Sequence, residues 1–520
     1  MSGKLDEFLW IVVLGGICGF GYGFLIGAND VANAFASSVS SKSITLKQAV
    51  IIASIFEFSG AFFLGASVTG TIRGKIVSTD LYTDEPEVLL FGMFTSLFSA
   101  IIILFAATHF GLPVSTTHDI VACIMGFTIA AKGFDSVNWE VARKIFMSWV
   151  ASPLLSGAVG AFLFANVKYL VMKSKNPFQR AFWTFPIVLT IGIGIDLFYV
   201  LYKGTSNMKA FQGDLKLSWV LPVSFGTGAF AGFIWLLALG PIVKRRIEAQ
   251  NSARIAAITD SEKGNPESNT AEDIEEPSEA QNTVSVPSVK DSNGEESEEP
   301  SAEDKAVRGG VLGAWDRLAA ATFSQDLHGQ ALTESKRAAE IWEEGEKFDD
   351  KAEDLFTYVQ VFTACLNSFA HGANDVSNTI APLSAIIQIY REGSVSGKSE
   401  VQEWVLAFGG AAIVIGLLLY GYKVIKSIGY KLTLLSPSRG ASAELAASLI
   451  VVTASFNELP VSSTQCIVGA VSGVGLVGGL KNVQWLFLLR VCVGWVVMFF
   501  VAALLSAGVF SFGAFAPSLV

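Results

Sequence analysis

One polar motif occurs twice in otherwise apolar sequence. It reads Gly-Ala-Asn-Asp-Val-Ala-Asn at residues 27–33 and Gly-Ala-Asn-Asp-Val-Ser-Asn at residues 372–378, so that Asp30 and Asp375 lie 345 positions apart. A carboxylate among apolar residues is costly to place at membrane depth, and where it occurs it usually marks an ion pathway or a binding site. We therefore interpret Asp30 and Asp375 as functional residues.

A second polar motif follows each copy of the first. Residues 111–118 read Gly-Leu-Pro-Val-Ser-Thr-Thr-His, and residues 459–465 read Leu-Pro-Val-Ser-Ser-Thr-Gln. The proline follows Asp30 by 83 positions in the first copy and Asp375 by 85 positions in the second. This matching order and spacing indicate an internal duplication. In membrane transporters, duplicated halves with interrupted helices place a binding site at their interface.

Both motifs contain residues that favour helix starts. We expect a helix to stop near Gly27 or Gly372 and to restart at the acidic residue, because Gly tolerates a chain break and Asn and Asp are strong N-caps. Pro113 followed by Ser115 or Thr116 predicts a further helix start. The free N–H groups and the positive dipole end of a restarted helix would suit an anion.

The predicted ligands are a small oxyanion and hard cations. Hydroxyl and amide groups, which both motifs supply, can donate and accept hydrogen bonds. An anion at ~4 Å from the carboxylate of Asp30 or Asp375 would be repelled by ~4 kcal/mol at an effective dielectric constant near 20. Cations must therefore enter with the anion, and an inward Na+ gradient could concentrate it. The predicted mechanism is symport.

Further carboxylates lie within apolar segments. Glu57 and Glu444 are each interpreted as an ion ligand or a proton carrier, with a neutral state or pairing to a nearby Arg or Lys as the alternative. Asp119 and Asp196 are weaker candidates, because the duplication gives neither of them a counterpart.

The elements that must position these residues are membrane helices. Of the 520 residues, 51% are apolar and only 16% are charged, whereas a soluble chain has about 25% charged residues. The mean hydropathy is +0.50, and runs able to cross ~30 Å of hydrocarbon recur along the chain. We predict an all-α polytopic membrane protein. Its membrane segments are expected at about 8–26, 31–41 (a half-helix), 48–68, 90–110, 115–131, 145–172, 183–202, 218–243, 356–371, 376–390, 403–424, 443–458, 463–479 and 484–513.

Composition divides the chain into an N-terminal membrane half, residues 1–243, an acidic insert, residues 244–354, and a C-terminal membrane half, residues 355–520. The insert contains 27 acidic and 13 basic side chains, a net charge of −14 against −10 for the whole protein. The basic cluster at 244–246 predicts that this side of the membrane is cytosolic. The insert is interpreted as a tether between the halves, with regulation by phosphorylation or partner binding as the alternative.

The insert itself changes character along its length. Residues 251–304 are rich in Ser, Glu, Pro and Asn and free of aromatic residues, which predicts disorder. Leu, Trp and Ala return among charges at residues 313–354, where we expect one or two amphipathic surface helices.

The two pairs of motifs resemble the signatures of the PiT family of inorganic phosphate transporters. Residues 436–440 followed by Glu444 are similar to the family's fungal-type, sodium-dependent members. The resemblance covers both membrane halves and not the insert. It implies two inverted repeats with broken or re-entrant helices, about twelve transmembrane spans, outward-facing termini, a cytosolic central loop and a homodimer. It also implies Na+-coupled uptake of inorganic phosphate.

By position, the resemblance assigns ligands in both halves. Phosphate contacts are expected at Asn29, Asp30, Ser115, Thr116, Asn374, Asp375, Ser462 and Ser463. Sodium contacts are expected at Asp30, Asn33, Asp375 and Asn378, and also at Glu57 and Glu444. We expect a multi-pass protein of the plasma membrane whose partners are phosphate, sodium and the lipid bilayer, without enzymatic activity, cofactor or nucleic-acid partner.

The chain departs from the family pattern at four positions of the second half. Ser463 stands where Thr is frequent, and Gln465 stands where the first copy has His118. Asn457 and Glu458 place polar groups just before the proline, where small or apolar residues are expected.

Two other classes of function stay open. A proton-coupled phosphate carrier, or a permease for another tetrahedral oxyanion such as sulfate, would have the same architecture. An intramembrane hydrolase would pair a serine with His118 or His371. The second copy lacks a histidine at Gln465, which disfavours the hydrolase.

Overall fold

The computed structural model describes residues 5–204, 216–263, 336–395, 401–421 and 432–515. They belong to a main unit, within residues 1–247 and 325–520, and to a second unit, residues 248–324, of which the end of one helix is described. Both membrane halves of the sequence lie in the main unit.

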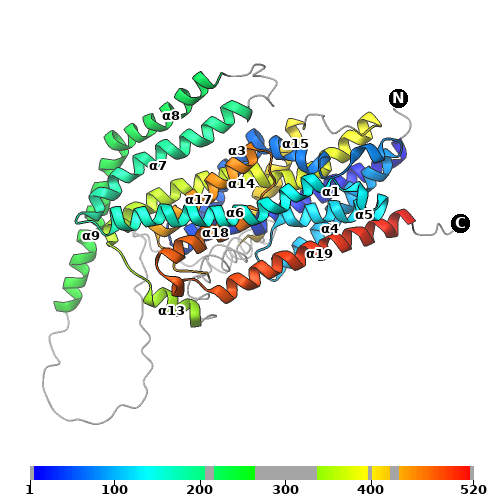
Figure 1. Ribbon diagram of the computed structural model, residues 1–520. Coiled ribbons are helices and arrows are strands. Elements are labelled where there is room, and N and C mark those ends of the chain that lie inside the picture. Colours follow the sequence, from blue (N-terminus) through cyan, green and yellow to red (C-terminus); the bar gives the residue numbers. More distant parts are fainter. Residues whose placement is uncertain (1–4, 205–215, 264–335, 396–400, 422–431, 516–520) are drawn as a thin grey trace, which may run out of the picture. The chain divides into compact units, whose positions relative to one another are not determined.

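The described residues are helical almost throughout and include no strand, which confirms the predicted all-α fold (Figure 1). The helices of the first half are α1 (Leu9–Ile26), α2 (Ala32–Ser40), α3 (Leu46–Gly74), α4 (Pro86–His109), α5 (Thr116–Lys132), α6 (Trp139–Asn166), α7 (Pro177–Tyr199), α8 (Leu217–Ile234) and α9 (Gly240–Lys263). After the insert come α13 (Lys336–Glu344), α14 (Asp350–Glu392), α15 (Glu403–Tyr420), α17 (Pro437–Phe456), α18 (Ser463–Val477) and α19 (Trp485–Phe515). Four π-helical turns extend or join these helices: η2 (Gly27–Val31), η5 (Val167–Met172), η6 (Val200–Gly204) and η9 (Trp235–Leu239).

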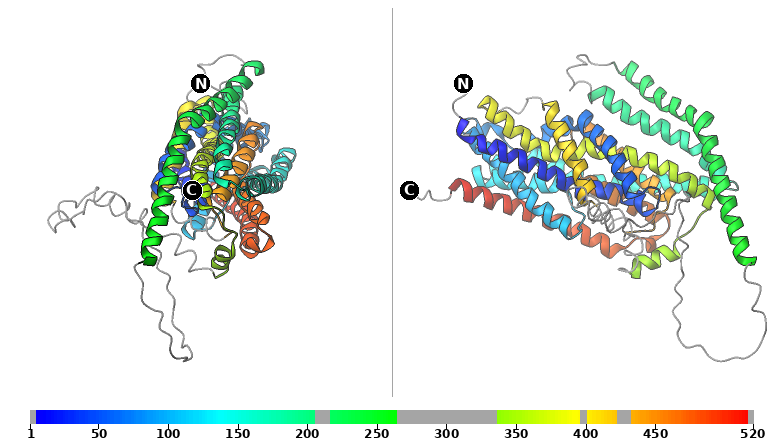
Figure 2. Two further views of the ribbon diagram at one scale, coloured as in Figure 1. Left: turned by 90° about the vertical axis from the view of Figure 1, so that its left-hand side faces the viewer. Right: turned by 180° about the vertical axis from the view of Figure 1, so that it is seen from behind.

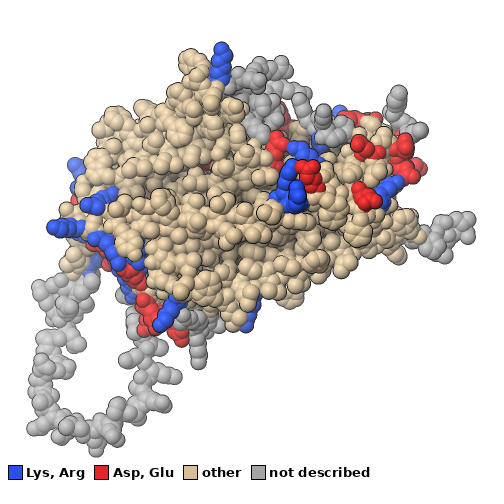
Figure 3. Space-filling model, viewed as in Figure 1, with Lys and Arg blue, Asp and Glu red and all other residues tan. Residues whose placement is uncertain are grey.

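Among the described residues, eight helices with their extensions are long and apolar enough to cross a membrane. Large apolar side chains point outward on them, for example Leu154 and Phe162 of α6, which are 69% and 66% exposed. In Figure 3 most of the charged side chains lie toward the two ends of the main unit, and the surface between them is largely uncharged. The chain is therefore a polytopic membrane protein, whereas the count of about twelve spans stays a prediction.

Neither copy of the Gly-Ala-Asn-Asp motif breaks its helix, and the predicted stop and restart are wrong. α1 continues into α2 through the single π-helical turn η2, and α14 runs unbroken through residues 372–378. The glycines serve helix packing instead. A Cβ atom on Gly27 would lie 1.8 Å from the carbonyl oxygen of Ile413, and one on Gly372 would lie 2.1 Å from that of Glu57. Close backbone contact between membrane helices accounts for both glycines.

The two helices that contain the first motif run antiparallel to each other. The Thr379 hydroxyl donates to the carbonyl of Gly19 at 2.5 Å, and the Asn367 amide donates to the carbonyl of Ala34 at 3.2 Å. Residue numbers thus increase along α1 and α2 in the direction in which they decrease along α14. The two motif-bearing helices therefore point in opposite directions.

Each second motif forms the tip of a helical hairpin. Hairpin 1 consists of α4 and α5 with its tip at residues 110–115, and hairpin 2 consists of α17 and α18 with its tip at residues 457–462. Ser115 and Ser462 are N-caps whose hydroxyl oxygens accept hydrogen bonds from the backbone N–H groups three residues later, at 3.3 and 3.2 Å. The predicted helix starts are confirmed.

The hairpins approach the centre of the main unit from opposite ends. We call the end where α14 begins the insert end and the end where it finishes the terminal end. α18 reaches the insert end, where the carbonyl of Val477 accepts a hydrogen bond from Lys168, which also pairs with Glu346. α5 reaches the terminal end, where Lys132 pairs with Glu85. Figure 2 shows the start of α1 and the finish of α19 at this same end.

The described parts of the insert agree only partly with the sequence prediction. α9 extends through Lys263, so the disorder predicted from residue 251 is wrong for its first stretch. Ala, Arg and Ile follow an already formed helix there, and extending a helix needs no new nucleus. α13, which buries Ile341, and the start of α14 agree with the predicted amphipathic helices. Residues 264–335 lie outside the described residues.

Candidate functional site

Asp30 contacts the first turns of α5 and α18, one from each hairpin. Its Oδ2 accepts from the Thr116 hydroxyl at 2.6 Å and from the Thr116 N–H at 3.4 Å, and its Oδ1 accepts from the Thr464 hydroxyl at 3.1 Å. Thr116 begins α5 and Thr464 lies in the first turn of α18, so one buried carboxylate contacts both copies of the second motif. Sequence reasoning missed Thr464, although it aligns with Thr117 in the duplication.

Asp375 has partners chiefly from the second half. Its carboxylate accepts from the Ser463 hydroxyl, from the Asn374 amide at 2.6 Å and from the Asn378 amide at 3.4 Å. The Nε2 atom of His371 lies 2.8 Å from its Oδ2. All five side chains are buried. Four of them, His371 being the exception, were predicted site residues, and the structure brings them together.

Hydrogen bonds between the copies interlock the two halves. The Asn378 amide donates to the hydroxyl oxygens of Thr116 and Thr117 at 3.2 and 3.1 Å. The Thr117 hydroxyl donates in turn to the carbonyl of Val461 at 3.1 Å. The two hairpin tips and the two motif-bearing helices therefore form a single polar centre.

The first asparagine of each motif holds a hairpin tip. The Asn29 amide donates to the carbonyl of Leu112 at 3.1 Å, and its oxygen accepts from the N–H of Val114 at 3.3 Å. The Asn374 amide donates to the carbonyl of Val461 at 2.8 Å. Amide groups match backbone groups in this way because they combine a donor with an acceptor. Asn29 and Asn374 thus position the tips beside the aspartates.

His371 links Glu57 to the centre. Its Nδ1 atom lies 2.5 Å from the Oε1 of Glu57, whose Oε2 accepts from the Ser368 hydroxyl at 3.2 Å, and its Nε2 atom faces Asp375. The sequence prediction considered His371 only for a hydrolase. The available signal was its position four residues before Asp375, which places both side chains on one helix face. The first copy has Ile26 there, so this link is not duplicated.

Glu444 lies in a different cluster. Its carboxylate accepts from the hydroxyls of Ser37, Ser38 and Thr363 and from the amide of Gln360, at 2.7 Å for Ser37, 2.8 Å for Thr363 and 3.1 Å for Gln360. These partners belong to α2, which follows η2 directly, and to α14. None of the contacts described for Glu444 joins it to Asp30 or Asp375 directly. Asn33, the remaining predicted sodium ligand, has a side chain outside the part of the structure that is described.

The polar residues before Pro460 have partners outside the centre. The Asn457 amide donates to the carbonyl of Thr453 at 2.8 Å, and Glu458 pairs with Lys75 at 2.6 Å. Glu458 has a left-handed φ of 59°, where the first copy has Gly111 with a φ of 64°. Neither Asn457 nor Glu458 is among the residues that contact the two aspartates.

The centre is suited to hold a cation. Ligand atoms of Asp30, His371 and Asp375 lie within 4.8 Å of one another, and all three residues are buried. The carboxylate, hydroxyl and amide oxygens around them are the ligand types that hard cations prefer. The cavity beside Asp30, His371 and Ser463 has a volume of about 10 Å³, which is room for roughly one water molecule. A larger anion therefore does not fit in this cavity.

The two histidines of the hydrolase hypothesis have other partners than serine. The ring of His118 packs on the ring of Trp149 with their centroids 3.7 Å apart. The Ser115 hydroxyl caps α5, and both ring nitrogens of His371 face carboxylates.

We expect the substitution His118→Gln to leave phosphate uptake within about threefold of the native rate. Gln465 stands at the equivalent position of the second copy, so a glutamine fits this place in the repeat. The initial rate of uptake into proteoliposomes measures the effect. If the folded variant lost uptake, His118 would be required for the mechanism.

The fold and the site define a class: a polytopic helical membrane protein whose two related halves converge four polar motifs on one buried centre. The sequence matches the Phosphate transporter family over residues 26–506. The chain belongs to this family.

Relatives and a solved structure agree over nearly the full length. The chain is 32% identical to the phosphate-repressible phosphate permease pho-4 of Neurospora crassa, with 96% of this chain and 97% of the relative covered. It is 30% identical to the sodium-dependent phosphate transporter 2 of Felis catus, with 97% and 98% covered. A solved structure described as the sodium-dependent phosphate transporter superposes with a TM-score of 0.72 at 27% identity and covers 98% of this chain and 100% of that one.

Proposed function

We propose that the protein couples the uptake of inorganic phosphate to Na+ by alternating access. One observation carries this proposal: Asp30 and Asp375, on antiparallel helices, share a buried centre with hydroxyls from the first turns of α5 and α18. Two carboxylates so placed repel an anion unless cations lie between them. Membership of the phosphate family and the sodium dependence named for two similar proteins support the same reading.

We propose separate roles for the residues that bind sodium and for those that bind phosphate. Asp30 and Asp375 hold sodium, with Asn33 and Asn378 as further ligands. Phosphate meets the hydroxyls and N–H groups at the starts of α5 and α18, at Ser115, Thr116, Ser462 and Ser463, beside the tips held by Asn29 and Asn374. Glu57 acts on this centre through His371. Glu444 is a ligand for a sodium ion in a separate polar cluster.

We further propose an inverted-repeat transporter that works as a homodimer in the plasma membrane, with the insert end and the central loop in the cytosol. The antiparallel course of the motif-bearing helices supports the inverted relation. The basic residues 244–246 support the cytosolic side. Residues 1–243 and 355–520 would be the two membrane halves and residues 244–354 the cytosolic connection.

The test is uptake of radiolabelled phosphate into proteoliposomes with an inward Na+ gradient, an inward K+ gradient or an inward proton gradient. We expect uptake with Na+ and at most one-tenth of that rate with K+ or with protons. Competition by unlabelled sulfate tests the substrate, and we expect none. Equal uptake without Na+ would refute the coupling, and a proton-driven rate would favour the proton-coupled alternative.

A further inference from the structure

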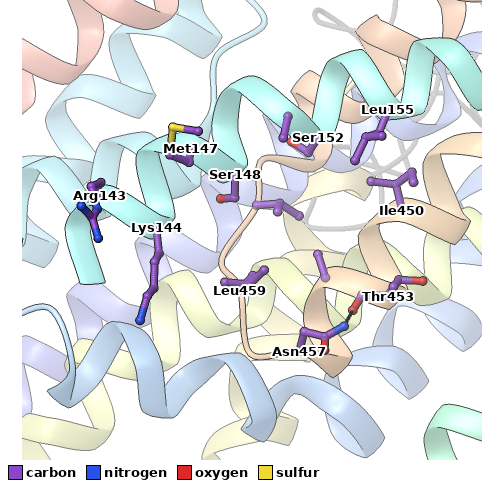
Figure 4. A pocket seen from close by; sticks show the side chains of 13 residues that line it. Arg143, Lys144, Met147, Ser148, Ser152, Leu155, Ile450, Thr453, Asn457 and Leu459 are labelled. Carbon is purple, nitrogen blue, oxygen red and sulfur yellow. Dashed lines mark hydrogen bonds between the residues drawn. The ribbon is translucent and has the colours of Figure 1, made fainter. Parts of the chain in front are cut away.

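Among the grooves outside the polar centre, two lie beneath the hairpin tips, one at each tip. The first has a volume of about 570 Å³ and lies between α6 and hairpin 2 (Figure 4). The second has a volume of about 720 Å³ and lies between α19 and hairpin 1. α6 packs parallel to α18 and α19 packs parallel to α5, so the first groove lies toward the terminal end and the second toward the insert end.

The grooves are built alike. Trp139 starts α6 and Trp485 starts α19, and each indole N–H donates to the backbone carbonyl five residues earlier at 2.9 Å. Five residues after each tryptophan comes a cation, Lys144 in the first groove and Arg490 in the second. Figure 4 shows Lys144 on the side of α6 that faces Leu459 of hairpin 2. This correspondence adds a third matching motif to the duplication.

Each groove is separated from the centre by the backbone of one hairpin tip. The wall of the first groove includes Val461, whose carbonyl accepts from Asn374. The wall of the second includes Leu112 and Val114, which Asn29 holds. A displacement of either tip would therefore connect its groove with the aspartates.

The charge of both grooves favours an anion. Arg143 and Lys144 line the first, Arg490 lines the second, and among the described residues neither lining includes an acidic side chain. Lys144 pairs with Glu140 at 2.8 Å, but both side chains are more than half exposed, and such surface pairs contribute little. A cation in a cleft with low-dielectric walls raises the local concentration of anions.

We propose that these grooves are the two waiting sites for phosphate, one on each side of the membrane, with Arg143 and Lys144 attracting the anion at the terminal end and Arg490 attracting it at the insert end. This inference rests on the proposed function. The alternative is that both grooves are filled by lipid and that the cations only reach for the membrane surface. Under that alternative, removing one cation has no effect specific to one side.

The test compares the two sides with matched variants. Uptake into intact cells reports the outer side, and uptake into inside-out vesicles reports the inner side. We expect the double substitution Arg143→Gln and Lys144→Gln to raise the half-saturating phosphate concentration roughly three- to tenfold on one side only, and Arg490→Gln to do so on the opposite side only. Each variant is the control for the other, and Arg490→Lys should restore the native value.

High salt supplies an independent readout, because it screens exposed charges. We expect the difference between native protein and variants to shrink as salt at a constant Na+ concentration is raised with a choline salt. If the native protein transports phosphate, two results would overturn the inference. One is that each variant changes the half-saturating phosphate concentration equally on both sides, and the other is that the variants change it on neither side. A native protein that fails to transport phosphate would instead overturn the proposed function itself.

Discussion

Replacing Asp375 by Asn is expected to lower Na+-dependent phosphate uptake by two to three orders of magnitude, and Asp30→Asn should do the same. Each carboxylate accepts several hydrogen bonds at the centre, and an amide would turn a donor toward other donors. It would also remove a negative charge at ~4 Å from a bound cation, which is worth about 4 kcal/mol at an effective dielectric constant near 20. Each 1.4 kcal/mol changes a binding constant tenfold.

The measurement is the initial rate of uptake into proteoliposomes across a range of Na+ concentrations. Asp135→Asn, at an exposed aspartate in the short turn Phe134–Ser136, is the matched control and should keep the native rate. Both site variants should keep the folded state, because the substitution preserves shape and the surrounding hydroxyls can turn. Native Na+-dependent uptake by Asp375→Asn would remove the aspartates from the coupling site.

Replacing His371 by Gln is expected to impair both folding and transport. The His371 ring lies between the carboxylates of Glu57 and Asp375, and both acidic side chains are fully buried. Without the ring, Glu57 keeps only the hydrogen bond from Ser368 among its described partners. Removing one member of a buried pair typically costs about 3–5 kcal/mol, because the other charge stays uncompensated.

The double variant His371→Gln with Glu57→Gln separates the two effects. We expect it to recover most of the thermal stability that His371→Gln loses, since the charge of Glu57 is removed together with its partner and Asp375 keeps its hydrogen bonds from Ser463, Asn374 and Asn378. Contacting residues commonly show coupling of about 0.5–3 kcal/mol in such a cycle. Transport should stay low, because Asp375 still lacks the His371 contact. Thermal unfolding in detergent and uptake into proteoliposomes measure the two quantities. Additive losses of stability would show that His371 and Glu57 act separately.

The sequence by itself determined the membrane class, the duplication and most of the residues that meet at the centre, although not Thr464 and His371. A charged residue within a long apolar run usually marks a functional site. Asp30 and Asp375 are each followed by a hairpin motif at nearly equal spacing, and this repetition makes a binding site between two related halves the best explanation. The capping role of Ser115 and Ser462 was also predictable, because an N-cap depends only on its immediate neighbours.

The tertiary structure alone decided what each polar group does. Gly372 suggests a chain break from sequence, yet it lies against the backbone of Glu57, a contact 315 positions away along the chain. His371 belongs to the site because it contacts Glu57, and Glu444 lies outside the centre because it contacts Ser37 of α2. Both contacts join residues that are more than 300 positions apart in the chain. Local patterns record which residues can cap a helix or enter a membrane. Which donor meets which carboxylate depends on how helices far apart in the chain pack together, and no local pattern contains that information.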